Sequence, residues 1–473
     1  MIAMTTAALL AFMGGDEVWV APLSWLNDPK AVSTLAMIPK GEYHTFVVGN
    51  AVACRVDAPD EVEAEVFIVK CYPKFIYGKW DLRAYYMPTA KQSDPSGLWA
   101  VRFKANLPPG KHKFIIHTAK GDAQPTIGYE FQIVNLELPP ADIPFGMFYI
   151  TTRVPPEYGS LKYQDMYLQD MVEHGMTTVT VSTHTTGQNE QVKLFRLMQK
   201  YGLDRMPAML LTGCDDKPIA KIDGTEFLLY GPDEPSPDSR AECEASLARA
   251  RGAGMRHVTA ISAISAWSGL GSLFDIWVVH PDNGIEMPDM IAGGITPTLQ
   301  EYAKQSGASI WHYHCGMRGT NPKLQRYYSG LFTWAVGAKG CFRWAYVHDK
   351  NSCIRQDGTW NALQTNEFVL PTPDGPMPTV GWEGVREGVL DYRIIRALEK
   401  KVINATGKMA EAEKTAKAAL WLARLKHSVD PRFYGDFKWT DKDYFWDRPD
   451  VYDPGIDLAK MRADAIEHLA EGQ

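Results

Sequence analysis

The chain has 473 residues, a length that favours two to four domains at about 150 residues each. Its composition, with 45% hydrophobic and 22% charged residues, is that of a globular protein and excludes collagen-like, coiled-coil and disordered classes. The net charge is −7 and no dense basic run occurs, so we expect neither a nucleic-acid partner nor binding to an anionic membrane.

The first residues are apolar. Residues 2–13 are interrupted only by Thr5 and Thr6 and end at a glycine pair. This run is too short to span a bilayer but has the length of the apolar region of an export signal, without the basic start. We therefore interpret residues 1–16 as a signal remnant or N-terminal arm, which favours a secreted or periplasmic location. No other stretch approaches the roughly 20 apolar residues of a membrane-spanning helix.

Seven cysteines lie between Cys54 and Cys353, with no C-x-x-C pair and no zinc-ligand spacing. Such residues are typically buried free thiols. A bridge between Cys54 and Cys71, in neighbouring predicted strands, is the alternative.

Residues 17–140 are expected to form a β-sandwich. Segments rich in valine, phenylalanine and tyrosine alternate with turn residues and show little helical periodicity, which is typical of this architecture. The predicted strands cover residues 17–23, 43–56, 65–75, 98–107, 111–118 and 127–138. Residues 138–144 (LPPADIP) follow as a stiff linker, and we expect the chain to divide there into two compact bodies.

From residue 141 to 405 strands alternate with helices, which predicts a (β/α)8 TIM-type barrel. Strands are expected at 146–152, 177–183, 206–211, 226–230, 257–264, 276–280, 309–314 and 341–347, and helices at 161–174, 190–201, 240–253, 299–305, 324–336 and 382–402. Only residues 212–225 separate strands three and four, so we expect an irregular third unit. Residues 406–473 are expected to pack on the barrel as a helical extension.

An acidic doublet follows the fourth predicted strand, in residues 229–235 (LYGPDEP). Active sites of this fold lie at the carboxyl ends of the strands. Asp233 and Glu234 lie between two prolines that restrict the backbone. Acidic doublets are usually solvated or cap helices, and this chain has others. The position of this one favours a catalytic role.

Cleavage of a glycosidic bond normally uses two carboxyl groups about 5 Å or more apart. The seventh predicted strand, 309–315 (SIWHYHC), carries no acid, and the other acids at strand ends are Asp282 and Asp349. An adjacent pair suits a mechanism in which the substrate's own 2-acetamido oxygen attacks the anomeric carbon. A barrel hydrolase that uses Asp282 or Asp349 with a sugar lacking the acetamido group is the alternative.

Five motifs span most of residues 17–400, at 42–46 (EYHTF), 231–235 (GPDEP), 311–316 (WHYHCG), 342–346 (FRWAY) and 381–392 (GWEGVREGVLDY). In order and spacing they resemble glycoside hydrolase family 123, the retaining β-N-acetylgalactosaminidases, and their TIM-barrel relatives. The resemblance implies that Asp233 orients the acetamido group, that Glu234 is the general acid/base, and that the substrate is an oligosaccharide or glycan. The chain departs from the family in its short third unit and histidine-rich strand seven. A glycan-binding relative without turnover is a further alternative.

Aromatic residues on strands seven and eight are candidate substrate-binding groups. Trp311 and Tyr313 share one face of strand seven, and Trp344 and Tyr346 share one face of strand eight, so each pair could form a wall for a sugar. Inward-facing aromatic residues also simply fill barrels, and that interpretation stays open for all four.

The sequence also contains a histidine pair on strand seven and a charged cluster in the last barrel helix. His312 and His314 form an H-x-H pair, which metal-dependent amidohydrolases place on the first strand and not the seventh. We expect them to be hydrogen-bonding or core groups, with His314 a substrate-binding candidate. Arg386, Glu387 and Asp391, at the start of the last barrel helix, are interpreted as a structural ion-pair cluster.

No metal or organic cofactor is expected, because the doublet and the aromatic residues offer no credible ligand set. Dialysis against a strong chelator should leave turnover unchanged. A loss of turnover that added zinc restores would contradict this prediction and make His312 and His314 metal ligands.

Overall fold

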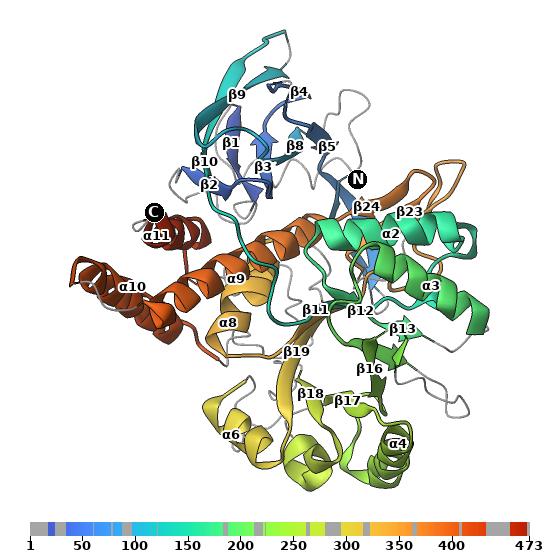
Figure 1. The fold of residues 1–473 in the computed structure, drawn as a ribbon. Helices are drawn as coiled ribbons and strands as arrows, with labels where there is room; N and C mark the ends of the chain where they lie inside the picture. Colours follow the sequence, from blue (N-terminus) through green and yellow to red (C-terminus); the bar gives the residue numbers. More distant parts are fainter. Residues whose placement is uncertain are drawn as a thin grey trace.

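The computed structural model describes residues 18–23, 35–59, 61–76, 79–87, 97–120, 122–182, 188–211, 221–222, 224–261, 265–279, 295–315, 322–361, 367–405, 409–431 and 455–470. An N-terminal β-sandwich is followed by a parallel barrel and C-terminal helices (Figure 1). The predicted fold class is confirmed. No helix of the described part is long and apolar enough to cross a membrane.

The sandwich consists of two four-stranded sheets. The first contains β1 (Trp19–Pro22), β3 (Tyr43–Gly49), β8 (Leu98–Lys104) and β5 (Ala64–Ile68), and the second contains β2 (Ala36–Pro39), β10 (Thr126–Val134), β9 (Gly110–Ala119) and β4 (Ala53–Asp57). The predicted strand at 43–56 is in fact two strands, because Asn50 takes a left-handed backbone (φ 62°) and turns the chain between the two sheets. The predicted strand at 65–75 also divides, into β5 and β6 (Lys70–Ile76), which pairs with β7 (Lys79–Tyr86).

The first sheet is buried on both faces. One face packs against the second sheet around Phe46, Trp99 and Phe103. The other face contributes Val47 and Ala100 to a cluster that includes Val380, the first residue of the long helix α9 (Val380–Asn404). This explains why β3 is buried at every residue after Tyr43 and shows no alternation between buried and exposed positions.

The barrel strands all pair in parallel. Their order is β11 (Phe145–Met147), β12 (Thr178–Val179) with β13 (Val181–Ser182), β14 (Ala208–Leu211), β16 (Thr225–Tyr230), β17 (Arg256–Ile261), β18 (Ile276–Val279), β19 (Ser309–Cys315) and β20 (Cys341–Trp344). Because β12 pairs with β11 and β13 with β14, the two short strands together form the second strand. The pairing of β20 with β11 closes the ring.

Most of the predicted barrel helices occur within a few residues of their expected bounds, as α2 (Leu161–Glu173), α3 (Gln188–Lys200), α4 (Arg240–Gly252), α6 (Pro297–Gln305) and α9. The described part of the C-terminal extension contains α10 (Met409–Ser428) and α11 (Leu458–Ala470). The described part of the third connection is β15 (Lys221–Ile222), which pairs antiparallel with β16. The predicted helix at 324–336 is instead α7 (Pro322–Tyr327), a π-helical turn η8 (Tyr328–Phe332) and α8 (Thr333–Ala335).

Glycines bring α9 into backbone contact with α7 and η8. A methyl group on Gly384 would meet the carbonyl oxygen of Pro322 at 2.3 Å, and one on Gly388 would meet that of Arg326 at 2.4 Å. From the opposite side, a methyl group on Gly330 would lie 2.6 Å from the carbonyl oxygen of Gly388. The four-residue spacing of the glycines in α9 therefore allows this close crossing.

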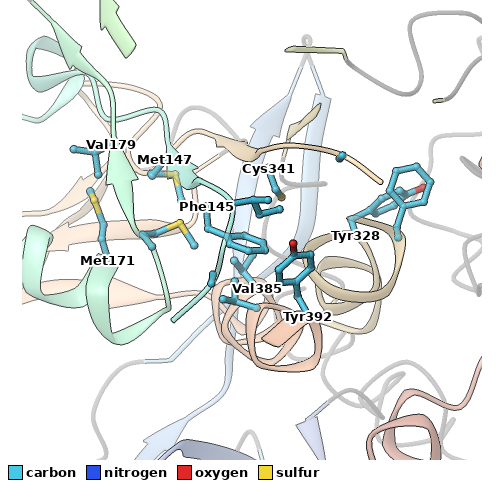
Figure 2. Packing of buried hydrophobic residues seen from close by; sticks show 14 of the residues in the cluster. Phe145, Met147, Met171, Val179, Tyr328, Cys341, Val385 and Tyr392 are labelled. Atoms are coloured by element: carbon cyan, nitrogen blue, oxygen red, sulfur yellow. The ribbon is translucent and has the colours of Figure 1, made fainter. Parts of the chain in front are cut away.

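The barrel wall is packed against the same helix (Figure 2). Figure 2 shows Phe145 of β11 beside Cys341 of β20, with Val385 and Tyr392 of α9 near it, whereas Met147 lies toward Met171 and Val179. The rings of Phe145 and Tyr392 meet edge to face at 5.1 Å. Figure 1 shows α9 running between the sandwich and the barrel.

A row of buried charges lies along α9. Glu383 accepts hydrogen bonds from Thr45 and Arg102 of the sandwich at 3.0 and 3.2 Å, and it lies 3.2 Å from Nε2 of His174, just after α2. Arg386 also donates to Glu383. The side chains around Glu383 are buried or nearly buried. Their hydrogen bonds link the sandwich, the end of α2 and α9.

The opposite end of the row reaches the C-terminal helix. Glu387 is paired with His44 at 3.4 Å and with Arg462 of α11 at 2.5 Å. Asp391 accepts from Arg326 at 2.6 Å and from Arg462 at 2.5 Å. The set that was interpreted as a structural ion-pair cluster thus binds the sandwich, α7 and α11 to one helix.

This network predicts a pH dependence of stability. Burial alone would lower the pKa of His174, but the charges and hydrogen bonds of Asp170 and Glu383 outweigh it and raise the pKa to about 9 from an ordinary 6.5. The stabilisation is therefore complete below pH 6.5 and lost as the pH rises through about 9, on the order of 3 kcal/mol. Urea unfolding at pH 6 and pH 9.5 measures it.

The control variants for this measurement are both histidine replacements. His174→Gln should be less stable at pH 6 and should lose the dependence between the two pH values. His117→Gln, at an exposed histidine of β9, should keep it. Equal pH dependence in the two variants would contradict the assignment to His174.

Candidate active site

The acidic doublet lies at the carboxyl end of the barrel, where the chain leaves β16. Backbone hydrogen bonds from Gly231 to Val258 (2.8 Å) and from Glu234 to Ala260 (3.0 Å) fasten this segment to β17. Glu234 adopts a left-handed backbone with φ 46°, which is uncommon for a residue with a side chain. The side chains of Asp233 and Glu234 are both exposed. The backbone at this point is thus held by the neighbouring strand.

Asp233 is held by the last residue of its own strand. The hydroxyl of Tyr230 donates to Oδ1 of Asp233 at 2.5 Å. Restricted hydration and the charge of Glu234 raise the pKa of Asp233, against the opposing effects of the Tyr230 hydrogen bond and of Arg153. The carboxylate therefore stays accessible to a ligand while one of its oxygens is fixed.

Glu234 has a different partner. The hydroxyl of Tyr313, in β19, donates to Oε1 of Glu234. The structure thus brings three of the predicted site residues together, from strands four and seven. Each carboxylate of the doublet receives a hydrogen bond from its own phenol.

Aromatic rings lie beneath the doublet. Phe148, which follows β11, meets Tyr230, Tyr313 and Trp344 edge to face at 5.9, 6.2 and 5.3 Å. Trp344 is half-buried, and the guanidinium of Arg153 lies 4.9 Å from its ring centre. Arg153 also donates to the carbonyl of His348 at 3.2 Å. The predicted Trp344 therefore lies in the same aromatic cluster as Tyr313.

Trp311 lies deeper in the barrel. Its ring stacks on Phe342 at 5.6 Å, it is 3% exposed, and both rings belong to the apolar cluster that fills the barrel interior. Trp311 precedes Tyr313 by two residues, so it shares the inward face of β19 one layer further from the carboxyl ends. The structure places Trp311 in the barrel core.

His314 does not face the doublet. Alternation along β19 turns it outward with His312, toward the helix layer. His314 stacks on Tyr328 at 4.6 Å, and Nε2 of His312 lies 2.9 Å from the hydroxyl of Thr333. Both histidines are fully buried. The structure therefore places His314 in the helix layer, away from the doublet.

Tyr346 also lies outside the site. β20 ends at Trp344, so the two-residue alternation that was expected to align Tyr346 with Trp344 does not extend to it. Tyr346 is fully buried behind the barrel wall, and its hydroxyl donates to Asp170 of α2 at 2.7 Å.

The alternative second acids stay untested. Oδ1 of Asp349 accepts a hydrogen bond from the backbone N–H of Asn351 at 2.7 Å. Asp282 lies outside the described residues. Among the described residues no group of three His, Cys, Asp or Glu side chains could hold a metal ion. Cys54 is a free thiol, so the alternative bridge to Cys71 is wrong.

Three residues of the site were missed from the sequence. Tyr230 directly precedes the doublet motif, Phe148 lies just beyond β11, and Arg153 follows a few residues later. Their positions at strand ends are the signal that could have found them. Aromatic residues at such positions also fill barrels, so that signal alone does not select them.

The arrangement supplies two carboxylates with unequal partners. Asp233 has one oxygen fixed by Tyr230, and its other oxygen has no hydrogen bond to any described residue. Glu234 is next to it and is held from another strand. Such a pair can accept a hydrogen bond at one carboxylate and transfer a proton at the other.

Comparison with known proteins gives a family match for part of the chain and a match for the fold. Residues 232–398 match the family "Glycoside hydrolase 123, catalytic domain". A family 123 glycoside hydrolase from Clostridium perfringens, solved to study glycolipid glycan hydrolysis, superposes with a TM-score of 0.62 at 9% identity, over 96% of this chain and 99% of that one. A β-glucuronidase from Parabacteroides merdae reaches a TM-score of only 0.32 at 10% identity, over 72% and 52% of the two chains, and supports no argument. No curated protein matches.

Gly231 offers a test of how tightly the doublet is held. A methyl group there would lie 2.5 Å from Nε2 of His257 and 3.0 Å from Phe274, and His257 is itself held by Ser246 at 2.9 Å. Gly231→Ala should therefore shift the doublet, with a large loss of activity and a destabilisation of about 1–3 kcal/mol. Thermal unfolding and turnover measure the two effects.

The matched control is Gly252→Ala in α4. A methyl group on Gly252 meets nothing within 4 Å, so this variant should keep full activity and unfold at the same temperature or slightly above. Parent-like activity in Gly231→Ala would show that the segment tolerates displacement.

Proposed function

We propose that the protein, whose residues 232–398 match the glycoside hydrolase 123 catalytic domain, cleaves β-linked N-acetylgalactosamine from a glycan with retention of configuration. The proposed mechanism is substrate-assisted. The acetamido oxygen of the sugar is the nucleophile, and the intermediate is an oxazolinium ion. The observation that carries the proposal is the adjacent pair Asp233 and Glu234, each with its own tyrosine donor.

Asp233 is assigned to the acetamido group. As an ionised carboxylate it accepts the amide N–H, which turns the amide oxygen toward the anomeric carbon and stabilises the positive charge that develops on the oxazolinium ring. The role requires one free carboxylate oxygen and a fixed orientation. The bond from Tyr230 to Oδ1 supports both requirements.

Glu234 is assigned to proton transfer. In the first step it protonates the leaving glycosidic oxygen as the acetamido oxygen attacks from the opposite side. In the second step it removes a proton from water, which opens the oxazolinium ion and restores the configuration of the starting glycoside. The side chain is exposed at the carboxyl end of the barrel, where a substrate and water can reach it.

The aromatic residues around the doublet support a sugar at this place. Trp344 and Tyr313 are assigned to substrate binding, because Tyr313 contacts Glu234 and both rings pack on Phe148 in one aromatic cluster. No substrate-binding role is proposed for Trp311, because its ring stacks on Phe342 inside the barrel.

Substitution of the two acids tests the roles. Glu234→Gln should be nearly inactive on natural glycosides, whose leaving groups need an acid, but should keep part of the first step on an aryl glycoside with an acidic phenol. Asp233→Asn should lose activity on both, because a good leaving group cannot replace the charge that orients the amide. Release of coloured phenol from aryl 2-acetamido-2-deoxy-β-galactosides is the measurement.

The alternatives give different results in the same assay. Azide should not rescue Asp233→Asn as an inverted glycosyl azide, because the nucleophile belongs to the substrate. A covalent sugar ester of Asp233 detected by mass spectrometry, or faster hydrolysis of the plain β-galactoside, would contradict the mechanism and favour a hydrolase of sugars without an acetamido group. Absence of turnover on every glycoside, with binding retained, would favour a glycan-binding protein.

A further inference from the structure

The phenol of Tyr230 lies between Asp233 and the neighbouring strand. Its oxygen accepts a hydrogen bond from the backbone N–H of Ala260 at 3.2 Å, and its hydroxyl donates to Oδ1 of Asp233 at 2.5 Å. Because the amide occupies a lone pair of the phenol oxygen, the phenolic proton is directed at the carboxylate. Tyr230 is therefore a donor whose position is set by the backbone of β17.

This bond affects both the charge and the orientation of Asp233. A donor on one oxygen favours the ionised form of a carboxylate. Two effects oppose ionisation here, since restricted hydration and the charge of Glu234 raise the pKa of Asp233. The hydrogen bond from Tyr230 is the strongest of the effects that lower this pKa, ahead of the charge of Arg153.

We propose that Tyr230 is a positioning residue that keeps Asp233 ionised and leaves its Oδ2 facing the acetamido group of the substrate. The inference rests on the proposed function, in which the amide N–H of the acetamido group needs an ionised acceptor at this place. Burial raises the pKa of the Tyr230 phenol well above its usual range, so it stays a hydrogen-bond donor throughout the working pH range. It acts through Asp233 and takes no part in proton transfer.

Tyr313 gives the contrasting case. It belongs to β19 and donates to Glu234, the proposed acid/base. Loss of the Tyr230 hydroxyl should therefore weaken the use of the acetamido group, whereas loss of the Tyr313 hydroxyl should alter proton transfer to the leaving group. The two tyrosines face different carboxylates, so their variants can be told apart by leaving-group dependence.

The experiment compares kcat/KM of Tyr230→Phe and Tyr313→Phe on two aryl 2-acetamido-2-deoxy-β-galactosides, one with an acidic and one with a weakly acidic phenol. Tyr230→Phe should lose about ten- to hundredfold on both, which is the usual effect of removing a hydrogen bond to a charged group. Tyr313→Phe should lose more on the weakly acidic phenol. Tyr163→Phe is the control, since its hydroxyl donates to Pro373 away from the doublet, at 3.0 Å.

The pH profile supplies a readout that a merely structural role would not move. Activity requires ionised Asp233, so the acid limb of kcat/KM follows the titration of Asp233. Removal of the Tyr230 donor raises the pKa of Asp233 and should move the acid limb to higher pH. Incorporation of 3-fluorotyrosine at position 230 makes the phenol a stronger donor in a parent-like fold and should move the limb to lower pH.

A double-variant cycle localises the effect. Tyr230→Phe added to Asp233→Asn should cause no further loss, because the residue through which it acts is already changed. Added to Glu234→Gln, it should cause the same loss as in the parent. Additive losses with Asp233→Asn would overturn the proposal.

The outcomes separate this inference from the proposed function. A parent protein that hydrolyses no aryl acetamido glycoside overturns the proposed function and the role of Tyr230 with it. A parent that does hydrolyse them, with Tyr230→Phe equal to Tyr163→Phe in rate and pH profile, overturns the role of Tyr230 alone.

Discussion

The fold depends on the carboxylate of Glu383, which is fully buried in α9 and receives hydrogen bonds from the sandwich, from the end of α2 and from its own helix. A buried carboxylate is costly unless it is fully paired. Here burial alone would raise its pKa, but Arg386, His174 and Arg102 together hold the pKa well below its usual range. Because each partner comes from a different segment, the pairing is complete only when the sandwich, the barrel and α9 are assembled.

The close packing of α9 depends on glycines that lie next to these buried acids in the sequence. Gly384 and Gly388 alternate along the helix with Glu383 and Glu387, so one face admits the backbone of α7 while the other faces charged partners. The glycines permit close approach, and the carboxylates fix which segments approach. Asp170 adds a further connection, since it accepts from Trp382 of α9 at 2.8 Å and from Tyr346 beyond β20.

Much of this fold could be predicted from the sequence, because the periodic patterns of its apolar residues are strong. Parallel barrel strands appear as short apolar runs, and the helices between them have clear apolar faces, so both were placed to within a few residues. The short β2 was missed, because four residues show no alternation and the strand is defined by parallel pairing with a distant β10. The turn at Asn50 was missed because asparagine tolerates a left-handed backbone without interrupting the apolar pattern.

The candidate site was harder to predict than the fold. The position of Asp233 and Glu234 after β16 followed from chain order alone. The face of β19 on which His314 lies could not be predicted from chain order. Both faces of a parallel barrel strand are buried, and a histidine can pack either in the barrel interior or against the surrounding helices. Tyr346 was misplaced because the end of β20 cannot be deduced from composition, and Tyr230 was missed because its importance lies in a hydrogen bond to the backbone of the next strand.

The burial of the first sandwich sheet on both faces has a consequence for how such a protein can change in evolution. A sandwich transplanted onto another barrel would bring Arg102 and His44 to a helix without matching acids, and its second apolar face, around Val47, would be left in water. Domain shuffling is therefore disfavoured here. The sandwich, the glycine-rich helix and the barrel that they join are expected to diverge as one inherited unit.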